Sequence, residues 1–498
     1  MSQDLDVSRP PSQGWSRRKL LASAGIGAAV VGVGFGATAP AADAVTTTND
    51  YFSVLFYGAT GNGTTDDTAA VQAAITAAQT QGGTVYFPAG KYLLKGTGTQ
   101  LLLVSSQVRL LGDGNSSYLY IDSTVPNTTD VIRLSPPVGG GSGFGWIIDG
   151  LQFIPKSGTP ARHAINIDIS TSGQFMAKML IQNCFVQKLN GRAIFLNNPT
   201  NADGLFTSTI TNNFFHGGMS LQNAGDSINI IGNTLTDSNC GLDLSQVSGA
   251  RNVVVAFNNI TSVGGGVRIT PGTIGGGPGG ENKIISNQIE QIATPTGPEG
   301  AMIAVVGTST AIIGSTEIYG NNLDGHGFAT NQVYLAYASY TKIRDNVMLS
   351  PASSAIKILS TSDNTEVNYN TFGAGQTANA LVSDAGVGTI GVLRPVTLLN
   401  SWYNPDVVQY GTVGATKLPD GTVVCTGVIA GGATLSGTAL FNLPVGFRPA
   451  FARRFMVSSM TGSTLAPAFL DVHANGDVVI IGGGNTFAAL DSITFLAV

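Results

Sequence analysis

The sequence is poor in charge and in the residues that build compact cofactor sites. Only 11% of its 498 residues are Asp, Glu, Lys or Arg, and it has three cysteines and four histidines. Its formal net charge of −5 gives no basic footprint of the kind that binds nucleic acid. It contains no Cys/His zinc pattern, phosphate loop or nucleotide fingerprint, and its cysteines are too scattered for a disulfide framework. These absences argue against nucleic acid as a partner.

The N-terminus carries an export pattern. Residues 16–21 read SRRKLL, a glycine- and alanine-rich apolar run follows over residues 22–39, and Ala42-Asp43-Ala44 has the form of a cleavage site. We therefore predict a twin-arginine signal peptide over residues 1–44. A membrane anchor is the alternative, but the glycines lower the hydrophobicity and the cleavage site is present. The mature protein is then expected to be secreted, with no stable membrane anchor.

One short phrase is repeated through the middle of the chain. It consists of an apolar residue, two variable positions, an asparagine, one variable position and another apolar residue, as in residues 230–235 (IIGNTL). Copies recur at intervals of 20 to 34 residues, which suits coils with loops of differing length. Its asparagines are Asn183, Asn213, Asn233, Asn258, Asn287, Asn321, Asn346 and Asn370. This repetition predicts a solenoid in which the asparagines stack.

A second phrase follows each copy of the first and alternates with a period of two. Residues 241–244 (GLDL) and 266–269 (GVRI) are examples, and each predicts a strand with two apolar residues inward and one residue outward. Two or three such strands per coil predict a parallel β-helix. The outward positions should form one column, with neighbours about 4.8 Å apart. We place in it Asn166, Phe195, Ser220, Asp243, Arg268, Ile303, Tyr334 and Lys357.

The solenoid begins with a dense group of turn and helix signals. Residues 57–68 read YGATGNGTTDDT, the next residues predict a helix with Val71, Ala74, Ile75 and Ala78 on one apolar face, and residues 82–90 read GGTVYFPAG. Such a helix can cover the open first coil. We interpret Asp66 and Asp67 as residues that cap it.

These segments resemble the opening of the pectate lyase superfamily of right-handed parallel β-helices. The resemblance is close over residues 51–114. From there to about residue 390 it consists only of the repeated phrases of the coils. It implies an all-β fold, with a β-helix over residues 45–392. That family includes polysaccharide lyases, glycosidases and phage tailspike depolymerases, so the resemblance implies a polysaccharide as the partner.

The repeat pattern of the sequence changes after residue 392. Residues 393–498 carry turn signals at Asp420-Gly421 and Asn475-Gly476 between short apolar runs, which predict a small β-sandwich. Residues 443–449 (LPVGFRP) resemble the C-terminal sandwiches of phage tail proteins and bacterial surface proteins. That resemblance implies a role in binding or in holding a homotrimer together.

The outward column contains the candidate catalytic residues Asp243, Arg268 and Lys357 and the candidate sugar-binding residue Tyr334. Arg and Lys pair with carboxylates, so the column suits an acidic or complex polysaccharide. A lyase needs a base and neutralisation of the uronate, by Ca²⁺ or by cationic side chains. Asp243 and Arg268 should lie on neighbouring coils, and a simple surface ion pair is the alternative reading of them.

A hydrolase needs two carboxylates about 5 to 9 Å apart. Asp226, Asp237, Asp243 and Glu281 lie near consecutive corners, and we include Asp226 and Asp237 among the substrate-binding candidates. Polygalacturonases resemble this fold, and their Gly-His-Gly motif is matched by residues 325–327, which makes His326 a further catalytic candidate. Their Asn-Thr-Asp and Asp-Asp motifs do not occur in the coils.

Two hypotheses follow. The first is a secreted polysaccharide lyase or glycoside hydrolase that acts along the outward column. The second is a non-catalytic extracellular glycan-binding or tail-fibre-like protein, which the missing acids leave open. No metal-ligand spacing is recognisable; Ca²⁺ is the one cofactor that the lyase chemistry would admit.

Overall fold

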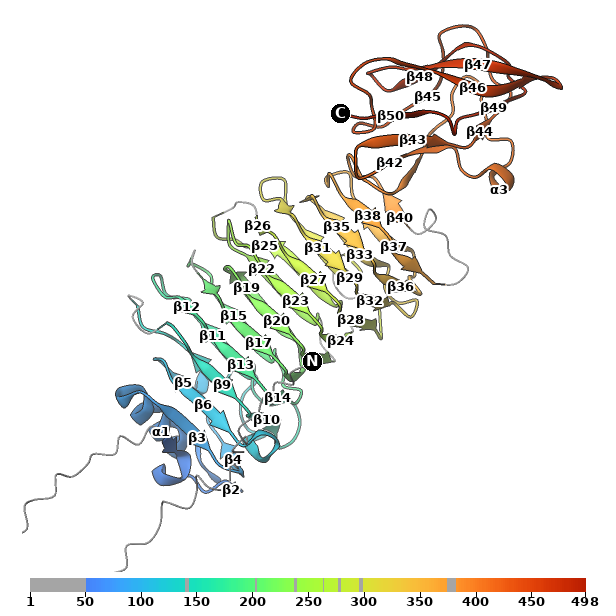
Figure 1. Ribbon diagram of the computed structural model, residues 1–498. Helices are drawn as coiled ribbons and strands as arrows, with labels where there is room; N and C mark the ends of the chain where they lie inside the picture. Colours follow the sequence, from blue (N-terminus) through green and yellow to red (C-terminus); the bar gives the residue numbers. More distant parts are fainter. Residues whose placement is uncertain are drawn as a thin grey trace, which may run out of the picture. The chain divides into compact units, whose positions relative to one another are not determined.

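The computed structural model describes residues 51–138, 143–201, 204–236, 240–262, 264–275, 279–294, 299–373 and 382–498. Almost all of its regular structure is β-strand, and three long sheets of parallel strands wind into a β-helix (Figure 1). Antiparallel sheets follow at the C-terminus. The predicted fold class is confirmed.

Each coil adds one strand to each of the three long sheets, except that the first coil, which contains α1, has no strand in the third sheet. Sheet A contains β1 (Tyr51–Ser53), β3 (Thr84–Phe87), β6 (Arg109–Gly112), β9 (Ile147–Asp149), β13 (Leu180–Gln182), β17 (Thr209–Thr211), β20 (Asn229–Ile231), β23 (Val254–Ala256), β27 (Lys283–Ile285), β31 (Glu317–Tyr319), β35 (Lys342–Arg344) and β38 (Glu366–Asn368). Sheet B contains β2 (Asn62–Asp66), β4 (Gly90–Leu94), β7 (Ser117–Ile121), β10 (Gln152–Pro155), β14 (Phe185–Val186), β18 (Phe214–His216), β21 (Thr234–Thr236), β24 (Asn259–Ser262), β28 (Gln288–Gln291), β32 (Asn322–Asp324), β36 (Val347–Leu349) and β39 (Thr371–Phe372). Sheet C contains β5 (Gln100–Val104), β8 (Asp130–Leu134), β11 (Ile165–Asp168), β15 (Ile194–Asn197), β19 (Met219–Ala224), β22 (Leu242–Gln246), β25 (Val267–Pro271), β29 (Ala301–Val306), β33 (Asn331–Ala336), β37 (Ser354–Ile358) and β40 (Val382–Asp384).

Two short parallel sheets mark the corner between sheets C and A. They are β12 (Met176–Ala177) with β16 (Leu205–Phe206), and β26 (Gly279–Gly280) with β30 (Ile313–Gly314) and β34 (Ala338–Ser339). Two 3₁₀ turns, η2 (Val54–Tyr57) and η3 (Gly114–Ser116), lie in the first coils.

The coils stack residue on residue. Ile181, Ile210 and Ile230 are paired in register on consecutive strands of sheet A, and all three side chains are buried. The same alternation holds in sheet C, where Leu242 and Leu244 are buried on either side of the half-exposed Asp243. A strand repeat of two residues therefore fills the interior with aliphatic side chains and sends every other side chain to a flat outer face.

A ladder of asparagine side chains runs through the corner between sheets A and B. Asn258 donates its backbone N–H and its Nδ2 to Oδ1 of Asn287, both at 2.9 Å, and a second Nδ2 hydrogen bond goes to the carbonyl of Ile230. The same pattern repeats from coil to coil. Its members are Asn213, Asn233, Asn258, Asn287, Asn321, Asn346 and Asn370. The predicted stack is confirmed for these seven.

Asn183 is not part of the ladder, contrary to the sequence prediction. Ile181 is in register with Ile210, so the residue equivalent to Asn213 is Cys184. Cys184 is buried and donates its backbone N–H to Oδ1 of Asn213. Asn183 instead hydrogen bonds to Asp149 and accepts from Asn212.

The helix α1 (Thr68–Gln81) covers the first coil (Figure 1). Val71, Ala74, Ile75 and Ala78 are completely buried, as the sequence predicted. This apolar face seals the end of the core, which would otherwise be exposed to water.

The two acidic residues before α1 have different partners. Asp66 accepts hydrogen bonds from the backbone N–H and the hydroxyl of Thr68, as expected of a capping residue. Asp67 does not cap the helix through its side chain. Its buried carboxylate accepts from the backbone N–H groups of Thr60 and Gly61 and so fixes the turn of the opening motif.

The C-terminal part forms two antiparallel sheets around a core of its own, which includes Phe441 and Phe447. One contains β41 (Leu393–Pro395), β42 (Gly414–Lys417), β43 (Thr422–Thr426) and β50 (Thr494–Leu496). The other contains β44 (Val428–Ile429), β45 (Thr438–Asn442), β46 (Arg453–Thr461), β47 (Thr464–Val472), β48 (Asp477–Gly482) and β49 (Phe487–Ala489). A short helix, α3 (Val407–Tyr410), precedes β42.

The predicted signal peptide, residues 1–44, lies outside the described residues. Among the helices in the described ranges, none is long and apolar enough to cross a membrane.

We predict that Asn258→Ala lowers the free energy of unfolding by about 3 kcal/mol, because buried donors of Asn233 and the carbonyl of Ile230 lose their partners. The neighbouring Asn259→Ala removes an exposed side chain and should change it by less than about 0.5 kcal/mol. Urea unfolding of both variants measures the difference. Equal effects would contradict a stabilising role for the ladder.

Candidate functional site

The outer face of sheet C carries the predicted column, with one correction. Pairing aligns Asn166, Phe195, Ser220, Asp243, Arg268, Ala304, Tyr334 and Lys357. Ile303, which the sequence placed in this column, is in register with Val267 and Val333 and is buried. Residues 301–306 are apolar without interruption, so their period of two cannot be recognised from sequence. Ala304 is the column residue.

Arg268 lies between two carboxylates. Its Nη1 is 3.5 Å from Oδ1 of Asp243 on the preceding strand. On its other side, Nε and Nη2 donate to the carboxylate of Glu299 at 3.1 to 3.3 Å. Burial disfavours the charged form of Arg268, but the hydrogen bonds and charges of Glu299 and Asp243 outweigh it and raise the arginine pKa. One guanidinium therefore holds both acids on the face of sheet C.

Glu299 is the residue that sequence reasoning missed. It lies just before β29, outside both repeated phrases, and its side chain is 8% exposed. Ala304, two strands from Asp243 in the column, has only a methyl group and leaves room for a carboxylate from this loop. No repeat pattern in the sequence marks a loop residue that folds back in this way.

Tyr334 and Lys357 follow Ala304 in the column. Burial, and then the charge of Glu299, raise the pKa of the Tyr334 phenol. Lys357 is in register with Tyr334, and its Nζ donates to the hydroxyl of Ser383 at 2.8 Å. The structure thus aligns Asp243, Arg268, Tyr334 and Lys357 in one column, as predicted from the repeat, but only Asp243 and Arg268 are in contact.

A depression of about 340 Å³ opens beside Asp243 and Arg268, and Glu299 is not among the residues that line it. Asp243 and Arg268 line it together with polar residues of β19, β22 and β25, among them Ser220, Gln222 and Ser245. Its walls combine these hydroxyls, amides and charges with apolar surface from Pro199, Leu221 and Pro271, a mixture that suits the hydroxyls and C–H groups of a sugar.

His163 and Phe195 lie further along the column, two strands from Asp243. Their rings stack with centroids 4.4 Å apart and an interplanar angle of 8°. The Nδ1 atom of His163 accepts the backbone N–H of Arg192, and burial lowers the pKa of His163 to about 4. His163 is a buried neutral support for Phe195.

The remaining candidates lie elsewhere. Asp226 lines a separate depression with Phe206 and Ser248. His326 lies beyond the end of β32, with its Nε2 2.8 Å from Glu290 and 3.6 Å from Asp324. Asp237 falls outside the described residues.

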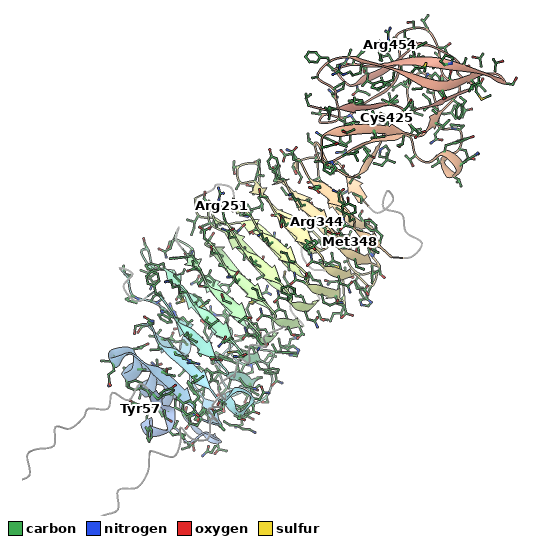
Figure 2. The ribbon with its side chains drawn as sticks, in the orientation of Figure 1. Tyr57, Arg251, Arg344, Met348, Cys425 and Arg454 are labelled. Carbon is green, nitrogen blue, oxygen red and sulfur yellow. The ribbon has the colours of Figure 1, made fainter. Side chains whose placement is uncertain are left out.

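Glu281, which the sequence offered as one of several possible hydrolase acids, does not join Asp243 either. Its carboxylate is 2.5 Å from the guanidinium of Arg251, a residue labelled in Figure 2. Over the described ranges, no three His, Cys, Asp or Glu side chains are grouped so that they could hold a metal ion.

A known protein family matches the N-terminal coils of the β-helix. Residues 51–268 match the family described as "Rhamnogalacturonase A/epimerase, pectate lyase-like". This part of the chain is pectate lyase-like. The match includes the opening motif, α1 and the coils up to Asp243 and Arg268, so the predicted resemblance is confirmed.

The curated relatives match over a short segment. Mannuronan C5-epimerase AlgE3 of Azotobacter vinelandii is 41% identical over 88 residues, which are 16% of this chain and 5% of that protein. Alginate lyase 7 of the same organism is 39% identical over 88 residues, which are 16% of this chain and 10% of that protein. The chain therefore spans only a small part of the length of these relatives.

Solved structures with a similar chain path include a tailspike protein of E. coli bacteriophage HK620 in complex with a pentasaccharide. That likeness has a TM-score of 0.49 and 14% identity, and it covers 89% of this chain and 94% of the tailspike. The A-module of the Azotobacter vinelandii epimerase AlgE4 has a TM-score of 0.40 and 16% identity over 65% of this chain and 95% of that module.

We predict that acid destabilises the protein through His163. The unfolded ring takes up a proton near its usual pKa of 6.5, whereas the buried ring does so only near 4, so the folded state loses stability as the pH falls between these values. The loss should reach about 3 kcal/mol. His163→Gln should flatten the dependence of unfolding free energy on pH in this window. An unchanged slope would contradict the assignment.

Proposed function

We propose that this protein is a secreted glycoside hydrolase that cleaves a polysaccharide on the outer face of sheet C. The observation that carries the proposal is the pair of acids, Asp243 and Glu299, on the single guanidinium of Arg268. Because both carboxylates contact one planar group, their separation is compatible with the roughly 5 to 9.5 Å found in glycosidase pairs.

The chemistry follows from this pair. One group, as the carboxylic acid, protonates the glycosidic oxygen as the bond to the anomeric carbon breaks. The other, as the carboxylate, attacks that carbon or takes a proton from the attacking water. Arg268 positions both groups, and the hydroxyl of Tyr334 is placed to hydrogen bond to a neighbouring sugar. The hydroxyls and amides of the depression can bind further sugar hydroxyls.

Charge favours hydrolysis over lyase chemistry at this position. With both acids ionised, Asp243, Arg268 and Glu299 sum to one negative charge, which repels a uronate carboxylate. A lyase would need free positive charge here, and the charge of Arg268 is already paired on both sides. Lys357 lies further along the column, where an acidic group of a complex polysaccharide could still bind.

The comparisons support a polysaccharide as the substrate. The family description names a rhamnogalacturonase, and the two Azotobacter relatives are named for acting on mannuronan and alginate. The export pattern of residues 16–44 supports a place outside the cell. For the C-terminal sandwich we propose attachment to a partner or assembly of a homotrimer.

We predict that Asp243→Asn and Glu299→Gln each lower kcat by about 10² to 10⁴, because each removes an acid that must transfer a proton or attack. Release of new reducing ends from a panel of bacterial and plant polysaccharides measures the loss. Both substitutions keep the shape of the side chain, and Glu317→Gln on sheet A serves as the matched control with full activity.

If the wild-type protein binds a polysaccharide but releases no ends, the hydrolase proposal is wrong. That result would favour the second hypothesis, a non-catalytic glycan-binding protein. Release of unsaturated products instead of ordinary reducing ends would identify a lyase.

A further inference from the structure

Sheet B presents a second surface that the cleavage chemistry does not use. It is formed by the outward column Phe185, Phe214, Thr234, Asn259, Gln288 and Asn322, which we name the sheet B face. We propose that the sheet B face is a second glycan-binding surface, which takes an uncharged stretch of a polysaccharide running along the stack of coils. The ligand class rests on the proposed function, but the site is a different one.

One end of the sheet B face is aromatic. The rings of Phe185 and Phe214 stack with centroids 5.1 Å apart and an interplanar angle of 20°. Phe214 remains 37% exposed, although an aromatic side chain gains free energy from burial. Thr234, next in the column, is much shorter than Phe214, and the ring of His216 lies edge-on to Phe214 with the centroids 5.8 Å apart. A pyranose presents a face of C–H groups, which can stack on such a ring.

The rest of the face is an uncharged polar column. Thr234, Asn259, Gln288 and Asn322 are paired in register, so their side chains repeat about every 4.8 Å. Asn259 and Gln288 are exposed, and Asn322 donates from Nδ2 to Oε1 of Gln288 at 2.9 Å. Amides and hydroxyls both donate and accept hydrogen bonds, as sugar hydroxyls do. This match, without a charged side chain in the column, indicates a neutral sugar chain.

A second outward column of sheet B lies next to the sheet B face, and His326 contacts two of its residues. Thr236, Thr261, Glu290 and Asp324 are paired along it, and His326 contacts the last two. The Gly-His-Gly motif therefore belongs to the border of the sheet B face rather than to the carboxylate pair on sheet C.

The two glycan surfaces have different roles, binding on sheet B and cleavage on sheet C. A sugar bound on sheet B is not at the carboxylates of sheet C, so this surface holds polymer without cleaving it. Holding one segment of a long chain raises the effective concentration of other segments near Asp243 and Glu299. Short oligosaccharides, which cannot reach both faces, should gain nothing from it.

The test uses the full mature chain with Glu299→Gln, so that bound polymer is not cleaved. Retention in native gels that contain dextran, laminarin, galactomannan or alginate measures binding. We expect retention by at least one neutral polymer, and a weakening of roughly ten-fold in Phe185→Ala/Phe214→Ala. Phe214→Tyr should keep the binding of the parent, because a tyrosine ring stacks as well. The matched control, Tyr369→Ala, removes an aromatic side chain that is 85% exposed elsewhere and should bind like the parent.

In the active enzyme, the same double variant should raise KM for polymer and leave turnover of short oligosaccharides unchanged. Unaltered retention in Phe185→Ala/Phe214→Ala, or a preference for alginate over all neutral polymers, would overturn the proposal. Failure of the hydrolase proposal is separate, since it appears as absent product release by the wild-type chain, whatever the gels show.

Discussion

The one-to-one stacking of coils is the constraint on which the structure depends. It is enforced at the corner between sheets A and B, where each ladder asparagine bonds to a backbone carbonyl of an earlier coil and each except the last, Asn370, also bonds to the next asparagine. Six of the seven are buried, so a slip of one residue would leave several donors and acceptors without partners in the interior. The cost of such a slip keeps equivalent residues of successive coils directly above one another.

Because the coils stack in register, the residues at one variable position of successive coils form a continuous surface. The position after each ladder residue, variable in the repeated phrase, becomes the sheet B face with its aromatic and amide side chains. The outward position of the second phrase becomes the charged column of sheet C. One scaffold can thereby present an uncharged column of side chains on one sheet and a pair of acids on another, with no change in its core.

Much of this could be predicted from the sequence because the repeat itself reports the register. The β-helix, the stack from Asn213 onward, and the adjacency of Asp243 and Arg268 all follow from spacing. The errors occurred where spacing is ambiguous. Leu180-Ile181 and Phe185-Val186 satisfy the phrase in two frames, which misplaced Asn183, and the unbroken apolar run of β29 misplaced Ile303.

Glu299, the second acid of the pair, could not be predicted from the spacing of the repeats. Glu299 reaches Arg268 from a loop, and the path of a loop is set by tertiary contacts that no period describes. The separate locations of Asp226 and His326 likewise depend on which corner of the coil each residue occupies.

The central claim is that Asp243 and Glu299 add water across a glycosidic bond. The most direct measurement uses a polysaccharide that the protein cleaves. It is digested in water enriched in the heavy isotope of oxygen, and the products are analysed by mass spectrometry. Hydrolysis places the heavy isotope in the anomeric hydroxyl of each new reducing end, provided that the products are analysed before this hydroxyl exchanges its oxygen with solvent. Unsaturated products, with no oxygen taken up from water, would contradict it.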